Sequence, residues 1–240
     1  MSSHLVIVSG GSSGIGLELL AACPWSGARR IDVSRRGAPG CEHAKADLAD
    51  PASWPAIAAM FEREVSGFAG ERVVFFHSAG TLSPIGFAGE IDPVAYARNV
   101  LLNSAAPQVL GDAFLRAAAR TEARCQLVNV SSGAANNAYA GWSAYCAGKA
   151  AADQWVRTAG LEQERRGGRV RLLSVAPGVV ATAMQQEIRS TPRHDFPDVA
   201  TFVDLHEAGV LRDPASVARD LWALLDADLE NGAVLDLRDA

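Results

Sequence analysis

The sequence predicts an α/β fold, a single domain built on a parallel sheet of about seven strands with helices on both faces. Short apolar runs rich in β-branched residues alternate along the chain with longer stretches rich in Ala and Leu. That order is typical of strands and helices in a doubly wound sheet. Hydrophobic residues make up 49% of the 240 positions, which is enough for the large core that such a sheet needs.

Each expected strand is a short apolar run bounded by turn-forming residues, as in strands that are buried on both faces. Arg30–Ser34 is a weaker candidate, because Asp32 interrupts it. The other expected strands are Leu5–Val8, Val73–Phe76, Gln126–Val130, Val170–Val175 and Val234–Leu237.

The expected helices are the Ala- and Leu-rich stretches between these strands. Asp50-Pro51 and Asp213-Pro214 place a capping residue before a proline that suits a first helical turn. The charged segment Thr182–Val210 is expected to be irregular or weakly helical. It is either a cover over a substrate site or a surface excursion without a role. The expected helices are Ile15–Ala22, Pro51–Ser66, Pro93–Ala119, Trp142–Arg165 and Pro214–Ala227.

Composition argues against several classes of function. The net charge of −5 provides no basic face for a nucleic acid. The four cysteines show no paired spacing, which is typical of a reducing compartment. No leader or membrane-spanning apolar run is apparent, and the histidines lack metal-ligand spacing. We therefore expect a cytoplasmic protein that binds a small molecule and has no metal, membrane or nucleic-acid partner.

A glycine-rich turn follows the first strand directly. Its glycines let the backbone approach a pyrophosphate, and the next helix offers free N–H groups and the positive end of its dipole. A glycine-rich turn alone is a weak signal, but strand, turn and helix in this order favour a dinucleotide site. The expected contacts are Ser9, Gly10, Ser12, Ser13, Gly14, Ile15 and Gly16.

A tyrosine and a lysine stand four residues apart, so Tyr145 and Lys149 share one face of the expected helix. The ammonium group favours the phenolate, which lowers the pKa of the tyrosine and suits it to general acid–base catalysis. Ser132, at the end of the preceding strand, could hydrogen-bond the same carbonyl oxygen. Such pairs also occur by chance, with a core tyrosine and a solvated lysine, but the serine and the glycine-rich turn together favour catalysis.

Together these motifs resemble the short-chain dehydrogenase/reductase family across nearly the whole chain. The glycines at 10, 14 and 16 match the family's TGxxxGxG pattern, with Ser9 in the threonine position. The resemblance implies a Rossmann-type fold, a nicotinamide cofactor and hydride transfer to or from a carbonyl compound. It implies that Ser132 holds the substrate carbonyl and that Tyr145 donates the proton. Lys149 would lower the tyrosine pKa and bind the nicotinamide ribose.

The resemblance also implies further contacts. Asn103 would support a proton-relay water, with Asn99 as its rival, and the simpler alternative for either is a local hydrogen bond. His77-Ser78-Ala79-Gly80 departs from the family's NNAG segment, and we expect His77 to be buried and hydrogen-bonded. The remaining implied cofactor contacts are Asp47, Leu48, Ala79, Gly80, Pro177, Gly178, Val180 and Thr182.

The end of the second strand bears on which nicotinamide dinucleotide binds. An acidic residue there would bond the ribose 2′-hydroxyl of NAD, and an arginine would bond the 2′-phosphate of NADP. Asp32 falls inside the strand, whereas Ser34 and Arg35 fall at its end. Because a guanidinium suits a phosphate, we expect NADP(H). The alternative is that Arg35 and Arg36 form a solvated loop.

Between residues 131 and 211 the sequence resembles the sepiapterin reductase-like branch of the family, and most of all its bacterial benzil reductases. The resemblance implies reduction of one carbonyl of a vicinal diketone to give an α-hydroxyketone. A pterin substrate would instead need a carboxylate in the pocket, for which Asp195, Asp198 and Asp204 are available. The candidate substrate-pocket residues are small, apolar or aromatic: Ala134, Tyr139, Trp142, Val179 and Met184.

Two other classes of protein share this pattern. A catalytically idle NADP(H)-binding sensor usually lacks the tyrosine or the lysine, and both are present here. Sugar-nucleotide epimerases and dehydratases carry a larger C-terminal region than follows Pro177. The family resemblance further implies a homodimer or homotetramer paired through the long helices Pro93–Ala119 and Trp142–Arg165.

Overall fold

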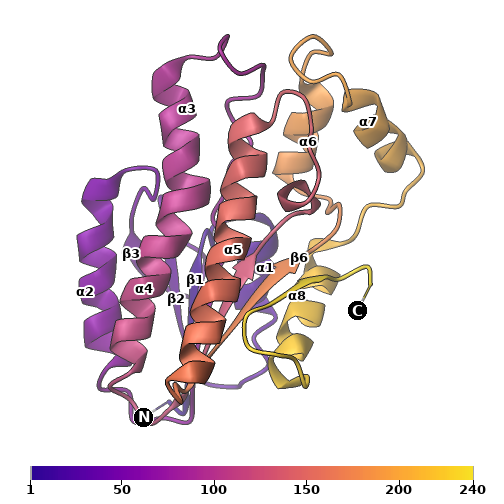
Figure 1. The fold of residues 1–240 in the computed structure, drawn as a ribbon. Coiled ribbons are helices and arrows are strands. Elements are labelled where there is room, and N and C mark those ends of the chain that lie inside the picture. The colour runs from indigo at the N-terminus through magenta and orange to yellow at the C-terminus, as the bar shows by residue number, and fades with distance from the viewer. Residues whose placement is uncertain (1, 240) are drawn as a thin grey trace.

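The computed structural model, which describes residues 2–239, contains a seven-stranded sheet with helices on both faces (Figure 1). Every neighbouring pair of strands is parallel, in the spatial order β3-β2-β1-β4-β5-β6-β7. This confirms the predicted doubly wound α/β fold. The strands are β1 (His4–Ser9), β2 (Arg29–Ser34), β3 (Glu42–Lys45), β4 (Arg72–His77), β5 (Arg124–Val130), β6 (Val170–Ala176) and β7 (Ala233–Asp236).

The sequence analysis did not identify β3. This strand has the sequence Glu-His-Ala-Lys, is mostly exposed and contains no apolar run. It pairs with β2 at the edge of the sheet, where Ile31 lies opposite Glu42. Short, charged edge strands are common because they discourage pairing with other chains. The strand forms because β2 offers a free edge, and no local pattern signals that.

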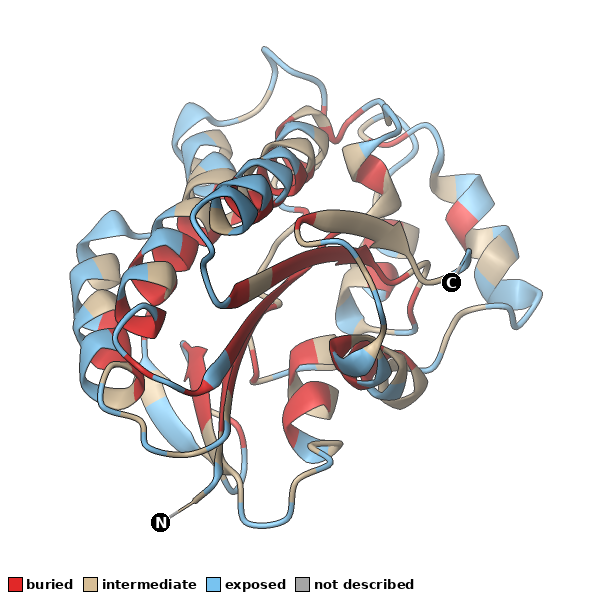
Figure 2. Ribbon diagram, turned by 60° about the horizontal axis from the view of Figure 1, so that its bottom comes forward, coloured by how far each residue is buried: buried red, intermediate tan, exposed pale blue. Residues whose placement is uncertain are grey.

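Helices cover the sheet in two layers, and their buried sides face the strands while their exposed sides face solvent (Figure 2). Three helices pack on one face and two on the other. Those on the first face are α2 (Trp54–Val65), α4 (Ala106–Ala118) and α5 (Ser143–Arg165), and those on the second are α1 (Gly14–Ala21) and α8 (Pro214–Ala223).

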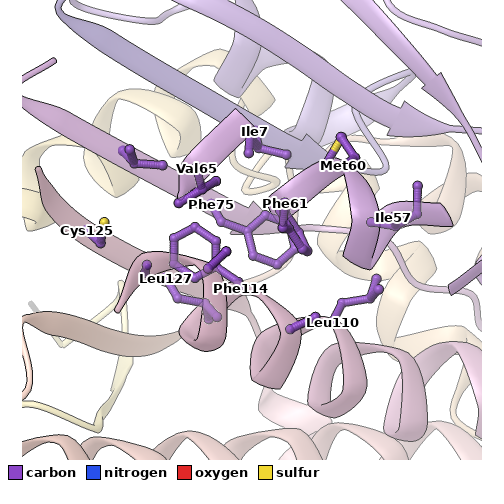
Figure 3. Close-up of a cluster of buried hydrophobic side chains, with 14 of the residues drawn as sticks. Ile7, Ile57, Met60, Phe61, Val65, Phe75, Leu110, Phe114, Cys125 and Leu127 are labelled. Carbon is purple, nitrogen blue, oxygen red and sulfur yellow. The ribbon is translucent and has the colours of Figure 1, made fainter. Parts of the chain in front are cut away.

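The core beneath α2 and α4 is built around three phenylalanine rings (Figure 3). Phe61, Phe75 and Phe114 pack against one another with ring centroids 5.0, 5.5 and 5.6 Å apart. Such pairs add about 0.5–1.5 kcal/mol each beyond the burial of their surface. The cluster joins β4 to both helices and so holds the strand ends that carry the site.

Aspartate followed by proline begins several helices, as the sequence predicts. The Asp50 carboxylate accepts the Ala52 N–H, ahead of a short 3₁₀ turn that leads into α2. Asp213 accepts the Ser216 N–H at the start of α8. Each cap satisfies an N–H group that the helix itself leaves unpaired.

The long helix predicted over residues 93–119 contains one wide turn. α3 (Pro93–Val100) passes through a π-helical turn, Leu101–Ala105, into α4. The Ala106 N–H donates to the Leu101 carbonyl, a five-residue spacing. Pro107 has no N–H, so it cannot close the usual bond to Asn103. Wide turns of this kind are frequent at functional sites, and this one carries Asn103 into the interior against α5.

The segment expected to be irregular or weakly helical forms two helices, α6 (Ala183–Ser190) and α7 (Val199–Glu207). It is anchored by buried side chains, among them Phe196 and Phe202, which join an apolar cluster with Trp142 and Tyr145. Phe196 is fully buried and stacks on Trp142 with ring centroids 4.4 Å apart. A few aromatic residues among many charged ones therefore order the segment.

Among residues 2–239, no helix combines the length and the apolar character needed to cross a membrane. Within the same residues, no group of three or more His, Cys, Asp or Glu side chains is arranged to hold a metal ion.

We expect Gly148→Ala to destabilise the protein. A Cβ at this position would lie 2.7 Å from the Asn103 Cβ and 3.2 Å from its carbonyl carbon, so α5 and the π-helical turn would have to separate. Overpacking of this kind costs about 1–3 kcal/mol. Urea denaturation measures the free energy of unfolding. Gly67→Ala is the matched control because an added Cβ there meets nothing within 4 Å. Equal losses in the two variants would contradict the close packing.

Candidate active site

A cleft opens where the strand order reverses, at the carboxyl ends of β1 and β4. Ligands of open α/β sheets bind at such a point, because the loops diverge there to opposite faces. The cleft has a volume of about 1260 Å³, above the range of roughly 300–1,000 Å³ for sites that hold one drug-sized ligand. It has room for a dinucleotide beside a second small molecule.

The glycine-rich turn forms one wall of this cleft. Gly10 has a φ of +74°, and a Cβ there would lie 2.8 Å from the Ala79 Cα. A Cβ on Gly16 would lie 2.4 Å from the Gly10 carbonyl oxygen. α1 begins directly after this turn, and no side chain caps it. Its first N–H groups are therefore available to an anion.

Most of the predicted site residues line the cleft, but Ser9, Gly16 and Asn103 do not. Those that line it are Gly10, Ser12, Ser13, Gly14, Ile15, Ser34, Arg35, Asp47, Leu48, Ala79, Gly80, Ser132, Ala134, Tyr139, Trp142, Tyr145, Lys149, Pro177, Gly178, Val179, Val180, Thr182 and Met184.

Ser9 and His77 tie the turns after β1 and β4 together behind the cleft wall. The Ser9 hydroxyl accepts the Ala79 N–H at 3.3 Å and lies 3.0 Å from the His77 Nδ1. The serine hydroxyl and the imidazole therefore share a hydrogen bond between the two turns. Burial, reinforced by the charge of Lys149, lowers the pKa of His77 to about 3. His77 is therefore a neutral, buried, hydrogen-bonded residue, as the sequence predicts.

At the end of β2, the acidic side chain is turned away from the cleft. The Asp32 carboxylate accepts the Gly11 N–H at 2.9 Å and the Ser34 O–H at 2.7 Å, and it is fully buried. Ser34 also accepts the Gly37 N–H, so its hydroxyl is committed to the local turn. Arg35 is exposed at the cleft edge and forms no ion pair within residues 2–239. Its guanidinium N–H groups have no hydrogen-bond partner within residues 2–239 and can donate to a ligand.

The same end of the cleft contains two arginines that the sequence analysis did not assign to it, Arg36 and Arg98. The Arg98 Nη2 donates to the Asp47 carboxylate at 2.7 Å, while the other oxygen of Asp47 accepts the Ala49 N–H. The pair fixes the loop that carries the expected cofactor contacts Asp47 and Leu48. Asp47 and Arg98 are 51 residues apart in the chain, and no local pattern connects them.

Ser132, Tyr145 and Lys149 converge near the middle of the cleft. Ser132 follows β5, and its hydroxyl accepts the Ala134 N–H at 3.2 Å. Tyr145 and Lys149 lie on α5 and are both buried. The Lys149 Nζ donates to the Val130 carbonyl at 2.8 Å and lies 5.8 Å from the centre of the Tyr145 ring. A strand end and a helix face thus bring the three predicted groups together.

Burial dominates the protonation of both α5 groups. It raises the pKa of Tyr145 to about 12, although the Ser132 hydroxyl lowers that pKa in part. Burial also lowers the pKa of Lys149 to about 8, and the charge of Asp153 raises that pKa in part. The sequence-based expectation of a lowered tyrosine pKa is not met, because burial outweighs the lowering effect of the Ser132 hydroxyl.

Asn99 and Asn103 hold the backbone that follows β4. The Asn103 amide accepts the Thr81 N–H at 3.1 Å and donates to the Thr81 carbonyl and the Asn99 side chain, both at 2.8 Å. Asn99 donates to the Ser83 carbonyl at 3.0 Å and lines the cleft. Asn103 lies behind Gly80, where a Cβ would be 3.1 Å from its oxygen and 3.5 Å from the Lys149 Nζ. It neighbours the lysine without facing the cleft.

The other end of the cleft is apolar and aromatic. Trp142 packs against the Tyr139, Phe202 and Tyr145 rings, with centroids 5.0, 5.3 and 5.9 Å away. Ala134, Val179 and Met184 complete this part of the wall. All five predicted pocket residues are therefore found together.

Two charged side chains that were not predicted also reach the aromatic end, Glu187 from α6 and Arg238 from beyond β7. Glu187 accepts the Ser83 hydroxyl across the cleft mouth. None of Asp195, Asp198 and Asp204 lines the cleft. Sequence patterns could not separate these acids, because the fold of the segment decides which of them faces inward.

Known proteins are similar in sequence to this chain over most of its length. The family model described as short chain dehydrogenase matches residues 4–193. A benzil reductase ((S)-benzoin forming) of Bacillus subtilis is 34% identical, over 98% of this chain and 99% of its own. Sepiapterin reductase of Rattus norvegicus is 33% identical, over 70% of this chain and 64% of its own.

Among solved structures, a short-chain dehydrogenase/reductase of Saccharomyces cerevisiae superimposes with a TM-score of 0.82 at 25% identity, covering 97% of this chain and 95% of its own. The family model and the near full-length relative together establish the family, whose members are oxidoreductases that use nicotinamide cofactors. This chain belongs to the short-chain dehydrogenase family.

Proposed function

We propose that the protein is an NADPH-dependent carbonyl reductase that reduces one carbonyl of a vicinal diketone, such as benzil, to an α-hydroxyketone. The observation that carries the proposal is the position of Tyr145, Ser132 and Lys149 between a nucleotide-sized channel and an aromatic pocket. The Bacillus subtilis relative, whose printed name describes a benzil reductase, supports the choice of substrate because it matches over almost the full length of both chains.

The nucleotide end of the cleft fits NADPH. The uncapped first turn of α1 suits the pyrophosphate. Lys149 would hold the nicotinamide ribose, and Arg35, with Arg36 beside it, suits a 2′-phosphate. Bound there, NADPH supplies the hydride for the reduction.

Ser132 and Tyr145 act on the oxygen of the reacting carbonyl. Hydrogen bonds from both hydroxyls hold this oxygen and stabilise the negative charge that develops on it. Tyr145 then transfers its phenolic proton to the oxygen, which completes the alcohol. The raised pKa keeps Tyr145 protonated at neutral pH before the reaction, as a general acid must be.

Lys149 stabilises the tyrosinate that remains. With a pKa of about 8, most of its amine is protonated at pH 7. Its charge lies beside the Tyr145 ring, and both side chains are buried, so that a charge–charge attraction between them is stronger than in water. The lysine therefore favours the deprotonated product of the transfer more than the neutral tyrosine.

The aromatic end of the cleft suits a planar, apolar substrate. Its rings and Met184 offer stacking surface. A pterin fits less well, because the aspartates that could anchor it do not line the cleft and Glu187 is engaged with Ser83.

Tyr145→Phe is expected to lower kcat with benzil and NADPH by about 10²–10⁴-fold, because it removes the general acid. Binding of NADPH, followed by its fluorescence, should be retained. The matched control is Tyr96→Phe, which removes a hydroxyl bonded to Ser143 from a tyrosine outside the cleft lining. If the wild type binds NADPH but oxidises none with benzil or a wider carbonyl panel, an idle sensor becomes the better description.

Arg35→Ala should raise the KM for NADPH by about 10- to 100-fold and leave the KM for NADH nearly unchanged, because a charge-assisted contact to the 2′-phosphate is lost. Parallel assays with the two cofactors provide the internal control. Turnover by the wild type with NADH alone would refute the assignment of Arg35 and the choice of NADP(H), while leaving the reductase proposal intact.

The difference in unfolding free energy between Lys149→Met and the wild type should depend on pH, and raising the pH should shift it in favour of the wild type. Burial lowers the lysine pKa from 10.5 to about 8. Between these values the unfolded chain retains a proton that the folded protein has lost, so the cost of burying Lys149 is full below pH 8 and fades toward pH 10.5. Between pH 7 and pH 10, the difference in unfolding free energy between Lys149→Met and the wild type should change by about 3 kcal/mol.

Urea unfolding of both proteins at pH 7 and pH 10 measures this difference. Lys45→Met, at an exposed position on β3, is the control. A difference for Lys149→Met that does not change with pH would show that the folded protein does not depress the lysine pKa.

A further inference from the structure

The last strand brings the C-terminal residues to the edge of the sheet that carries the site. β7 pairs with β6 so that Asp236 lies opposite Ala176, and the Leu237 N–H donates to the Ala176 carbonyl at 2.9 Å. The residues after β7 therefore emerge beside the cleft segment that begins at Pro177. Arg238 lies in the cleft lining as a result.

Two glycines locate the Arg238 side chain. A Cβ on Gly178 would lie 3.5 Å from both the Cγ and the Cδ of Arg238. A Cβ on Gly133 would lie 3.8 Å from its Nη2. The aliphatic stem thus passes Gly178, and the guanidinium ends beside the residue that directly follows Ser132. Arg238 belongs to the end of the cleft where the substrate carbonyl is held.

Asp236 fixes this guanidinium. Its two carboxylate oxygens accept the Arg238 Nε–H at 2.8 Å and an Nη2–H at 2.5 Å, and one of them also accepts the Arg238 backbone N–H at 2.9 Å. A bidentate pair of this kind holds the guanidinium in one plane. Nη1 has no hydrogen-bond partner within residues 2–239, so its N–H groups can donate to a ligand.

The other amide and carboxylate side chains at this end each form at least one hydrogen bond to a neighbouring group. Asn137 donates to the Gly133 carbonyl at 2.8 Å, and Gln185 donates to the Phe202 carbonyl at 3.0 Å. Glu187 accepts the Ser83 hydroxyl. The Glu187 side chain has no N–H to offer, so Arg238 is the charged side chain in this part of the lining that keeps unpaired N–H donors within residues 2–239.

We propose that Arg238 is a specificity-determining residue that donates a hydrogen bond to the second oxygen of a vicinal diketone. The two oxygens of such a substrate lie on adjacent carbons, so when Ser132 and Tyr145 hold the first, the second lies a few ångströms away. Because Asp236 compensates the arginine charge, the remaining N–H groups suit a neutral carbonyl. The inference rests on the proposed reductase function and explains how the pocket distinguishes a diketone from a simple ketone.

The test compares benzil with deoxybenzoin, which has the same two-ring skeleton but lacks the second oxygen. Arg238→Met should lower kcat/KM for benzil by about 10- to 100-fold, the effect of losing a hydrogen bond from a charged donor. It should change kcat/KM for deoxybenzoin by less than about 3-fold. Arg238→Lys should restore part of the preference for benzil, because it keeps a charged donor without the planar fork.

Arg116→Met is the control, since Arg116 is also an exposed arginine paired with a nearby aspartate, Asp112, and lies outside the cleft lining. Equal losses on both ketones, or an unchanged ratio, would overturn the role of Arg238 while leaving the reductase intact. If the wild type reduces neither ketone, the proposed function fails. Titration of benzil into NADP⁺-saturated protein, followed by tryptophan fluorescence, then decides the inference, and equal affinities of wild type and Arg238→Met would overturn it.

Discussion

The burial of the Lys149 ammonium is the constraint on which the rest of the site depends. A buried lysine is tolerated only if its charge is compensated and its N–H groups are hydrogen-bonded. The Val130 carbonyl at the end of β5 supplies the hydrogen bond, and Asp153, one turn further along α5, supplies the opposite charge. The position of α5 is therefore fixed by polar contacts at this end and by Val156 and Ala159 in the apolar core beyond. Tyr145 lies on the same face of α5, so the same contacts fix its position.

Asp153, which compensates the lysine charge, is itself held by a row of polar side chains that crosses the sheet. Ser9, His77, Asn129 and Ser174 are paired neighbours in β1, β4, β5 and β6. Asn129 donates to Ser174 at 2.8 Å, and Ser174 donates to Asp153 at 2.6 Å. The residues two positions earlier on these strands are apolar core. On this face of the sheet, apolar core residues are thus followed two positions later by a hydrogen-bonded polar network. That network holds Asp153 near Lys149. His77, which stands where the family has an asparagine, joins this row through its hydrogen bond with Ser9.

The fold and most of the cleft could be predicted because their signals are local. The glycine spacing, the Tyr-x-x-x-Lys pair and the apolar runs each lie within a few residues. What could not be predicted depends on contacts distant in sequence. β3 forms because it can pair with the free edge of β2. The segment 183–207 is ordered because Phe196 and Phe202 pack against Trp142. Arg98 and Arg238 join the cleft only through the folded chain. The pKa of Tyr145 could not be predicted for the same reason. The sequence spacing places the Lys149 ammonium near the tyrosine, but it does not show how deeply the tyrosine is buried. Burial has the larger effect on the pKa.

Trp142 contacts both the segment 183–207 and Tyr145. One side of its ring stacks on Phe196 from the cover, and its edge contacts Tyr145, three residues later in the chain. Its indole N–H is buried without a hydrogen-bond partner within residues 2–239, a cost of about 1–3 kcal/mol that the surrounding rings must offset. The ring seats the segment 183–207 over the pocket, and it limits the orientations that the Tyr145 ring can take. One side chain therefore contacts both the segment 183–207 and Tyr145, so that in the proposed reaction the phenol would be oriented before a substrate enters.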